Sequence, residues 1–187
     1  YRTTVPVGEA GTLDLGPVHN FGFVFLDGKQ LGIDDRRTSS FKIKVPARTQ
    51  PATLDVLVEA MGRVNFGEEV HDRKGIHGPV KLDGSELSDW KVFSFPLDNK
   101  MLGRLHFQKT AATGPAFWRG TIRVEKPGDT FLDLRSWGKG VVWINGHCLG
   151  RYWDIGPSQT AYVPGPWLKK GKNEVVILDL LGPEKPL

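Results

Sequence analysis

The chain has 187 residues, of which 39% are hydrophobic and 25% are charged, a balance typical of folded globular proteins rather than of disordered ones. Its 25 basic and 21 acidic side chains give a formal net charge of +4, and the basic residues are dispersed, so no nucleic-acid partner is expected. No apolar run approaches the roughly 20 residues of a membrane-spanning helix, so no membrane partner is expected either.

Short apolar or alternating segments recur along the chain, and helical periodicity is nearly absent. Turn residues such as Gly, Pro, Asn and Asp separate the segments. The pattern predicts an all-β protein with strands at 3–7, 22–26, 41–45, 54–58, 90–95, 104–108, 120–124, 130–134, 140–144, 159–163 and 174–180. One short helical turn is expected near 167–170.

One hairpin motif is written twice, as FVFLDGKQLG at 23–32 and VVWINGHCLG at 141–150. Each copy has an apolar run, an acidic or amide residue followed by glycine, two variable residues and Leu-Gly. Asp27-Gly28 and Asn145-Gly146 can both adopt the positive φ angles that a type I′ turn requires. Each copy is therefore predicted to form two antiparallel strands joined by a tight turn.

The likeness between the two halves extends beyond the hairpin. YRTTV at 1–5 resembles WRGTI at 118–122, and the Leu-Asp-Leu at 13–15 and Val-Pro at 45–46 return at 132–134 and 163–164. Matched landmarks in the same order indicate an internal duplication. We expect a β-sandwich at 1–84, a second at 117–187, and a linker at 85–116 that adds strands to either.

The search for catalytic and metal-binding chemistry gives little. A glycosidase needs two facing carboxylates, whereas the pairs Asp34-Asp35 and Glu68-Glu69 are adjacent and would point to opposite faces of a strand. The five histidines show no zinc spacing, so no metal site and no cofactor are assigned. Calcium held by Asp34, Asp35 or Asp72 is the weaker alternative. Cys148 is expected to be a buried small hydrophobic residue.

Aromatic residues are concentrated in the second half. Trp143 stands inside an apolar strand and is expected in the core. Tyr152 and Trp153 lie in GRYWDIGP, where either could stack on the apolar face of a sugar ring or pack inside a small sandwich. They are the candidate sugar-stacking residues, and the core is the equal alternative.

Five segments together resemble the carboxyl-terminal half of the β-galactosidases of glycoside hydrolase family 35, which include the lysosomal acid β-galactosidase and many bacterial relatives. They are YRTT, LVEAMGRVNFG, KGIHGPV, DWKVFSFPLD and GKGVVWINGHCLGRYWDIGPSQTAYVP. The resemblance covers essentially the whole chain. It implies a bacterial member of the family and two tandem β-sandwiches of galactose-binding-like, jelly-roll type.

In that family a (β/α)8 barrel with two catalytic glutamates precedes the β domains and hydrolyses terminal β-galactosides with retention. The chain begins YRTTVPV, without a methionine, and is expected to be a piece of a longer protein. By resemblance it lacks the catalytic residues and would not hydrolyse glycosides alone; its partner would be the barrel of the same parent chain.

The segment MGRVNFG supplies the candidates for facing the barrel or the substrate rim, namely Arg63, Asn65 and Phe66. The alternative is a loop held by its own side-chain to backbone hydrogen bonds. Some relatives carry tyrosine where Phe66 stands, so the polar sugar contact of that hydroxyl is not expected here.

A second hypothesis is an autonomous carbohydrate-binding module for galactose-containing sugars that uses Tyr152 or Trp153. Family habit implies the periplasm or cell exterior for a bacterial protein and the lysosome for an animal one.

Overall fold

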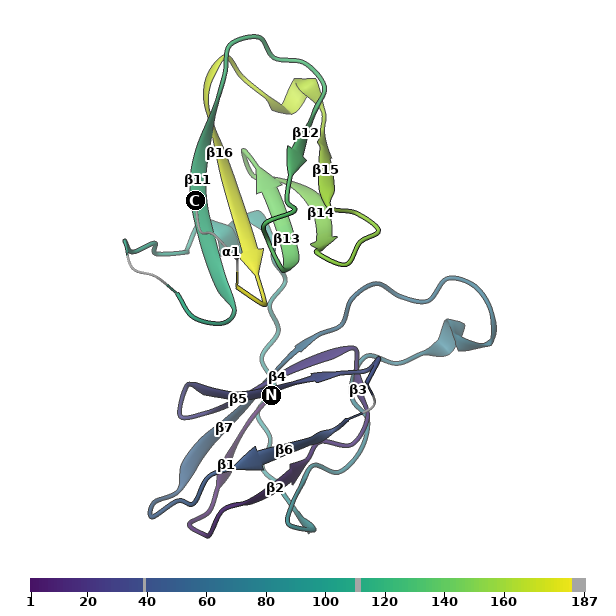
Figure 1. Ribbon diagram of the computed structural model, residues 1–187, viewed down its shortest axis with the longest axis vertical. Coiled ribbons are helices and arrows are strands. Elements are labelled where there is room, and N and C mark those ends of the chain that lie inside the picture. Colours follow the sequence, from purple (N-terminus) through teal and green to yellow (C-terminus); the bar gives the residue numbers. More distant parts are fainter. Residues whose placement is uncertain (39, 110–111, 183–187) are drawn as a thin grey trace. The chain divides into compact units, whose positions relative to one another are not determined.

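The computed structural model describes residues 1–38, 40–109 and 112–182 (Figure 1). Strands dominate it, as the alternating pattern predicted. The chain divides between Ser94 and Phe95 into two compact units. The residues expected to link the two domains are therefore shared between the units, 85–94 in the first and those from 95 onward in the second.

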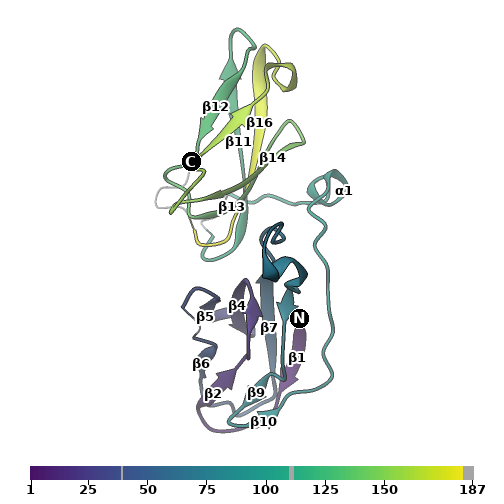
Figure 2. The ribbon, with the colours of Figure 1, turned by 90° about the vertical axis from the view of Figure 1, so that its right-hand side faces the viewer.

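The first unit is a sandwich of antiparallel sheets (Figure 2). One sheet has the order β1-β7-β4-β5 and the other β10-β9-β2-β6, while β3 and β8 form a small ribbon. Their bounds are β1 Arg2–Val5, β2 Gly11–Asp14, β3 Val18–His19, β4 Phe21–Leu26, β5 Lys29–Asp35, β6 Lys42–Val45, β7 Ala52–Glu59, β8 Gly75–Ile76, β9 Lys81–Leu82 and β10 Ser85–Glu86. Apolar side chains at alternate strand positions, such as Leu13, Val24 and Leu54, fill the space between the sheets.

The second unit repeats this plan. Its main sheet has the order β11-β16-β13-β14, and β12 pairs with β15. The bounds are β11 Ala116–Val124, β12 Thr130–Asp133, β13 Lys139–Ile144, β14 His147–Trp153, β15 Thr160–Val163 and β16 Gly171–Asp179, with a short helix α1 at Asn99–Leu102 and a helical turn η2 at Gly165–Trp167. The protein is thus all-β, with two tandem β-sandwich domains.

The internal duplication is visible in the register of the strands. Asp27 and Asn145 have φ angles of 48° and 47°, and the glycine after each also has positive φ, as a type I′ turn requires. Both hairpins carry a register shift at the same place, between Val24 and Phe25 and between Val142 and Trp143. The two predicted hairpins are confirmed, and the structure adds that both carry a bulge at the same position.

The turn residues also explain why an acid or its amide occupies that position. The side chain of Asp27 accepts a hydrogen bond from the backbone N–H of Thr53 at 2.8 Å, and Asn145 accepts one from Glu174 at 3.0 Å. Each turn is therefore fastened to the strand that runs beside its hairpin.

Trp143 is buried, as predicted.

Three predictions about local structure are wrong. Segments 90–95 and 104–108 are not strands. Phe107 of the second segment instead packs, with Leu97 and Leu102, on the outer face of the second unit's main sheet, whereas Trp90 of the first segment packs against the core of the first unit. Cys148 is exposed, because it lies opposite Trp143 on that outer face, beside the hairpin turn.

Candidate functional site: a projecting loop and its polar clamp

The loop 60–74 leaves β7 and returns to the sandwich at β8, and Figure 1 shows it projecting from the first unit. It carries the predicted residues Arg63, Asn65 and Phe66, together with the helical turn η1 at Glu68–His71. All three predicted residues are exposed, and Phe66 is 89% exposed. The structure thus brings them together at the tip of one loop.

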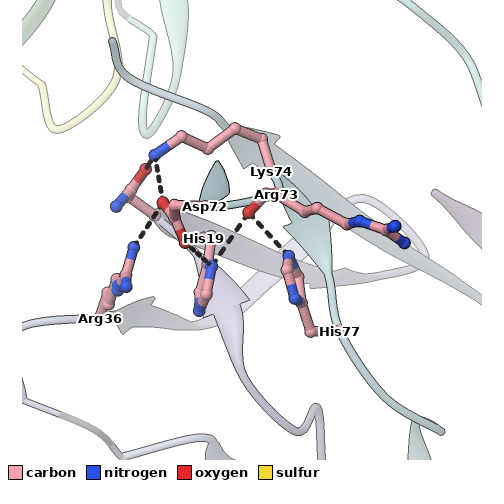
Figure 3. Close-up of polar contacts among 7 residues, drawn as sticks. His19, Arg36, Asp72, Arg73, Lys74 and His77 are labelled. Atoms are coloured by element: carbon pink, nitrogen blue, oxygen red, sulfur yellow. Dashed lines mark hydrogen bonds and ion pairs between the residues drawn. The ribbon is translucent and has the colours of Figure 1, made fainter. Parts of the chain in front are cut away.

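The tip is not held by these side chains. Within the described part of the chain, neither Arg63 nor Asn65 makes a hydrogen bond or an ion pair. The loop is instead fastened at its base, where Asp72 meets His19 and Arg36 from two other segments and Lys74 from the end of the loop itself (Figure 3). The alternative of a loop held by the polar side chains of its own tip is therefore wrong for these two residues.

Asp72 is the centre of this base, and its side chain is only 3% exposed. One carboxylate oxygen lies 2.8 Å from Arg36 Nη1 and 2.8 Å from Lys74 Nζ, and the other lies 2.8 Å from His19 Nδ1. Lys74 Nζ also donates to Asn20 Oδ1 at 2.7 Å. We call His19, Arg36, Asp72 and Lys74 the Asp72 clamp.

Two histidines extend the clamp through a backbone carbonyl. The carbonyl oxygen of Arg73 lies 3.0 Å from His19 Nδ1 and 2.8 Å from His77 Nε2, while the side chain of Arg73 points away (Figure 3). The two rings are 4.1 Å apart between centroids. Because a carbonyl oxygen only accepts, each of these ring nitrogens carries a proton when the bond forms.

The electrostatics of the clamp favour an ionised Asp72. The hydrogen bond from Lys74 is the largest cause, and with the bond from Arg36 it outweighs desolvation and holds the pKa of the Asp72 carboxyl well below its usual range. The carboxylate oxygens are fully engaged by cationic and imidazole donors. The clamp is therefore suited to holding the loop in place rather than to proton transfer.

The acidic pairs do not form a catalytic clamp. Asp34 is fully buried in the first unit, whereas its neighbour Asp35 bonds Arg37 at the surface. Glu68 and Glu69 lie side by side in the helical turn η1. Within the described residues no group of three or more His, Cys, Asp and Glu side chains is arranged to hold a metal ion.

The two predicted sugar-stacking residues lie in different environments. Tyr152 is 3% exposed, and its hydroxyl donates to Asp179 Oδ2 at 2.7 Å, so its ring belongs to the core and cannot stack on a sugar at the surface. Trp153 is partly exposed, but Lys139 Nζ lies 4.7 Å from its ring centroid and occupies one face.

Sequence reasoning missed two arrangements. In the Asp72 clamp His19 and Arg36 come from segments far from Asp72 and Lys74 in the chain, and no motif links the three places. Phe131 and Tyr162, 66% and 50% exposed, form a cross-strand pair with ring centroids 5.6 Å apart. The alternation in TFLD and TAYV could have revealed this pair, because Leu132 and Val163 face the core.

No helix in the described ranges is long and apolar enough to cross a membrane.

Two protein-family models match the chain. Residues 1–98 match "Beta-galactosidase, first all-beta domain" and residues 115–173 match "Beta-galactosidase, galactose-binding domain".

Individual relatives agree with the family models. The chain is 41% identical over 186 residues to human beta-galactosidase-1-like protein 2, covering 96% of this chain and 28% of that protein. It is 42% identical to a beta-galactosidase of Xanthomonas manihotis, covering 87% and 27%, and 37% identical to rat beta-galactosidase-1-like protein 3, covering 96% and 29%. The chain thus spans less than a third of each relative. With one model matching more than half of its residues, the chain belongs to the β-galactosidase family, of which it represents the non-catalytic β domains.

Proposed function

We propose that the chain is the carboxyl-terminal β region of a family 35 β-galactosidase, an enzyme that hydrolyses terminal β-galactosides, and that it stabilises the catalytic barrel and shapes its active-site rim. The loop 60–74 is the element proposed to make this contact. By family habit the parent enzyme would act in the periplasm, outside the cell or in the lysosome.

The observation that carries the proposal is the exposure of Phe66 at the tip of a fastened loop. An aromatic ring that is 89% exposed gains nothing for the fold of its own domain. The Asp72 clamp, by contrast, fixes the base of the loop with three cationic or imidazole contacts to one nearly buried carboxylate. A firmly based loop that presents an apolar ring and an arginine suits docking against another protein surface.

Kinetics and stability of the full-length enzyme test this proposal. Phe66→Ala should lower kcat/KM for a chromogenic β-galactoside and lower the Tm of the full-length protein, while leaving the Tm of the 187-residue chain unchanged. Val7→Ala is the matched control, because Val7 is 56% exposed and lies at the opposite end of the first sandwich. Equal effects of the two substitutions on the full-length enzyme would refute the docking role of the loop.

The alternative function is an autonomous carbohydrate-binding module. Of its two candidate sugar-stacking residues only Trp153 remains, because Tyr152 lies in the core. A galactose titration of the 187-residue chain, followed by tryptophan fluorescence, distinguishes the two functions. Saturable binding that is lost in Trp153→Ala would favour the module, and no binding is the expected result.

A further inference from the structure

The second sandwich is less completely covered than the first, and the internal duplication shows where. In the first unit β9 pairs with the outer edge of β2, joining Leu13 to Leu82 and Asp14 to Lys81. In the second unit β12 is the counterpart of β2, and among the described residues it pairs with β15 alone. One edge of β12 therefore has no strand beside it in the part of the chain that the structure describes.

The burial of matched residues points to the same side. Leu13 is fully buried, but its counterpart Leu132 is only partly buried. On the neighbouring edge strand Val5 is 1% exposed, whereas its counterpart Ile122 is again only partly buried. In the first unit Leu82 of β9, together with Leu87 and Trp90, packs against the core on this side.

The backbone of β12 is oriented to accept another strand. In the first unit the N–H of Leu15 donates to the carbonyl of Phe41, on the side of β6. The N–H and C=O of Thr12 point to the opposite side, where both bond Asp83. In the second unit Leu134 bonds Gln159 in the way that Leu15 bonds Phe41. The alternation of an antiparallel pair then directs the N–H and C=O of Phe131 and Asp133 to the open edge.

The surface next to this edge also differs in chemistry. Thr12 and Lys44 stand on the outer face of the first unit, with Lys44 Nζ 3.0 Å from Thr12 Oγ1. Their counterparts in the second unit are Phe131 and Tyr162, whose rings are largely exposed. A polar pair beside a covered edge has thus been replaced by an aromatic pair beside an open one.

From these observations we infer that an extended segment of the same polypeptide, lying outside residues 1–187, adds to the open edge of β12 as an antiparallel strand and completes the second sandwich. The inference extends the proposed function, because it rests on the chain being part of a longer enzyme. An open edge with exposed rings is a template for strand addition. By analogy with Leu82, the added segment places an apolar side chain beside Leu132 and covers Phe131.

Amide hydrogen exchange by NMR or mass spectrometry tests the inference in the 187-residue chain and in the full-length protein. We expect the amides of Phe131 and Asp133 to exchange rapidly in the chain alone and about 100-fold more slowly in the full-length protein. Equal exchange rates in both would overturn the inference. Protection that appears in the chain alone and rises with its concentration would assign the edge to a second copy, which also overturns it.

Substitutions give a second measurement. The double change Phe131→Ser and Tyr162→Ser should leave the Tm of the 187-residue chain nearly unchanged and lower that of the full-length protein. Ile155→Ser, at a residue 59% exposed in another loop, is the control and should affect neither. Because Phe66 lies in the other unit, the effect of Phe66→Ala on kcat/KM reports the loop contact separately from the exchange at β12, so the two proposals can fail independently.

Discussion

Asp34 and Tyr152 occupy equivalent positions in the two sandwiches, each opposite a glycine of the neighbouring strand, Gly22 and Gly140. The Tyr152 hydroxyl reaches Asp179, whereas both carboxylate oxygens of Asp34 are buried without a hydrogen-bond partner among the described residues. Burial, and secondarily the nearby charge of Asp35, raises the pKa of Asp34 to about 7. One duplicated position therefore holds a satisfied phenol in one unit and an unsatisfied acid in the other.

Asp34→Asn should remove a pH dependence of stability. In the unfolded chain Asp34 ionises near pH 4, and in the fold near pH 7, so the folded state binds more protons between these values. The contribution of Asp34 to stability is therefore fully present below about pH 4 and is lost as the pH rises through 7. Relative to the wild type, the free energy of unfolding of Asp34→Asn should rise by about 1.4 kcal/mol per pH unit across this window.

Urea titrations of the 187-residue chain at a series of pH values measure this difference. The exposed Asp154→Asn is the control and should run parallel to the wild type at every pH. If Asp34→Asn also runs parallel to the wild type, the Asp34 carboxyl is not buried as an acid.

Tyr152→Phe should destabilise the second unit. The hydroxyl is buried and donates to the Asp179 carboxylate at 2.7 Å, and such a bond contributes about 2 kcal/mol. Asp179 would keep its backbone donors Gly138, Leu181 and Gly182, so the unit should still fold. Thermal denaturation compares this variant with Tyr162→Phe, because Tyr162 is half-exposed and water can replace the hydrogen bond of its hydroxyl to Asp129. A larger loss in Tyr162→Phe would contradict the assignment.

The two glycines predict an asymmetric pair of substitutions. A Cβ at Gly140 would lie 1.7 Å from the carbonyl oxygen of Leu178, whereas one at Gly22 would lie 3.3 Å from Val18 Cγ1 and 3.6 Å from Asp34 Cβ. Gly140→Ala must therefore displace backbone and should cost about 3 kcal/mol or more, while Gly22→Ala should cost about 1 kcal/mol. Chemical denaturation of the two variants measures the order, and equal losses would show that the second sheet yields more easily than its packing implies.

The hairpins were predictable because their information is local. Asp27-Gly28 and Asn145-Gly146 specify the turn by their backbone preferences, and the strands follow on either side. The side on which Tyr152 and Trp153 face was not predictable, because the bulge in β14 inserts one residue and reverses the alternation beyond it. Apolar residues at 104–108 gave the pattern of a strand, but Phe107 packs on a sheet face instead.

The candidate site was predictable only at its tip. The segment MGRVNFG pointed to Phe66 through a family resemblance, but only the structure shows that the ring of Phe66 is exposed. The Asp72 clamp forms where β3, the residue after β5 and the residues before β8 meet, so His19 and Arg36 reach Asp72 through the fold and not through a spacing in the chain. Such long-range arrangements of polar side chains leave no periodic trace in a single sequence.

Asp72→Asn should loosen the loop 60–74 without unfolding the sandwich. The carboxylate is favoured in the fold by Lys74 first and then Arg36, so its folded pKa lies below that of the unfolded chain. Its contribution is therefore present above about pH 4 and is lost as the pH falls toward the folded pKa. Protection of the amides across 61–71, measured against the intrinsic exchange rate at each pH, should be lower in the variant at neutral pH, and acidification should lower it in the wild type more than in the variant. Asp83→Asn, which affects only the contact with the Thr12 N–H elsewhere in the first unit, is the control. Unchanged exchange in Asp72→Asn would mean that the loop holds its position without the clamp, and that the presentation of Phe66 does not depend on it.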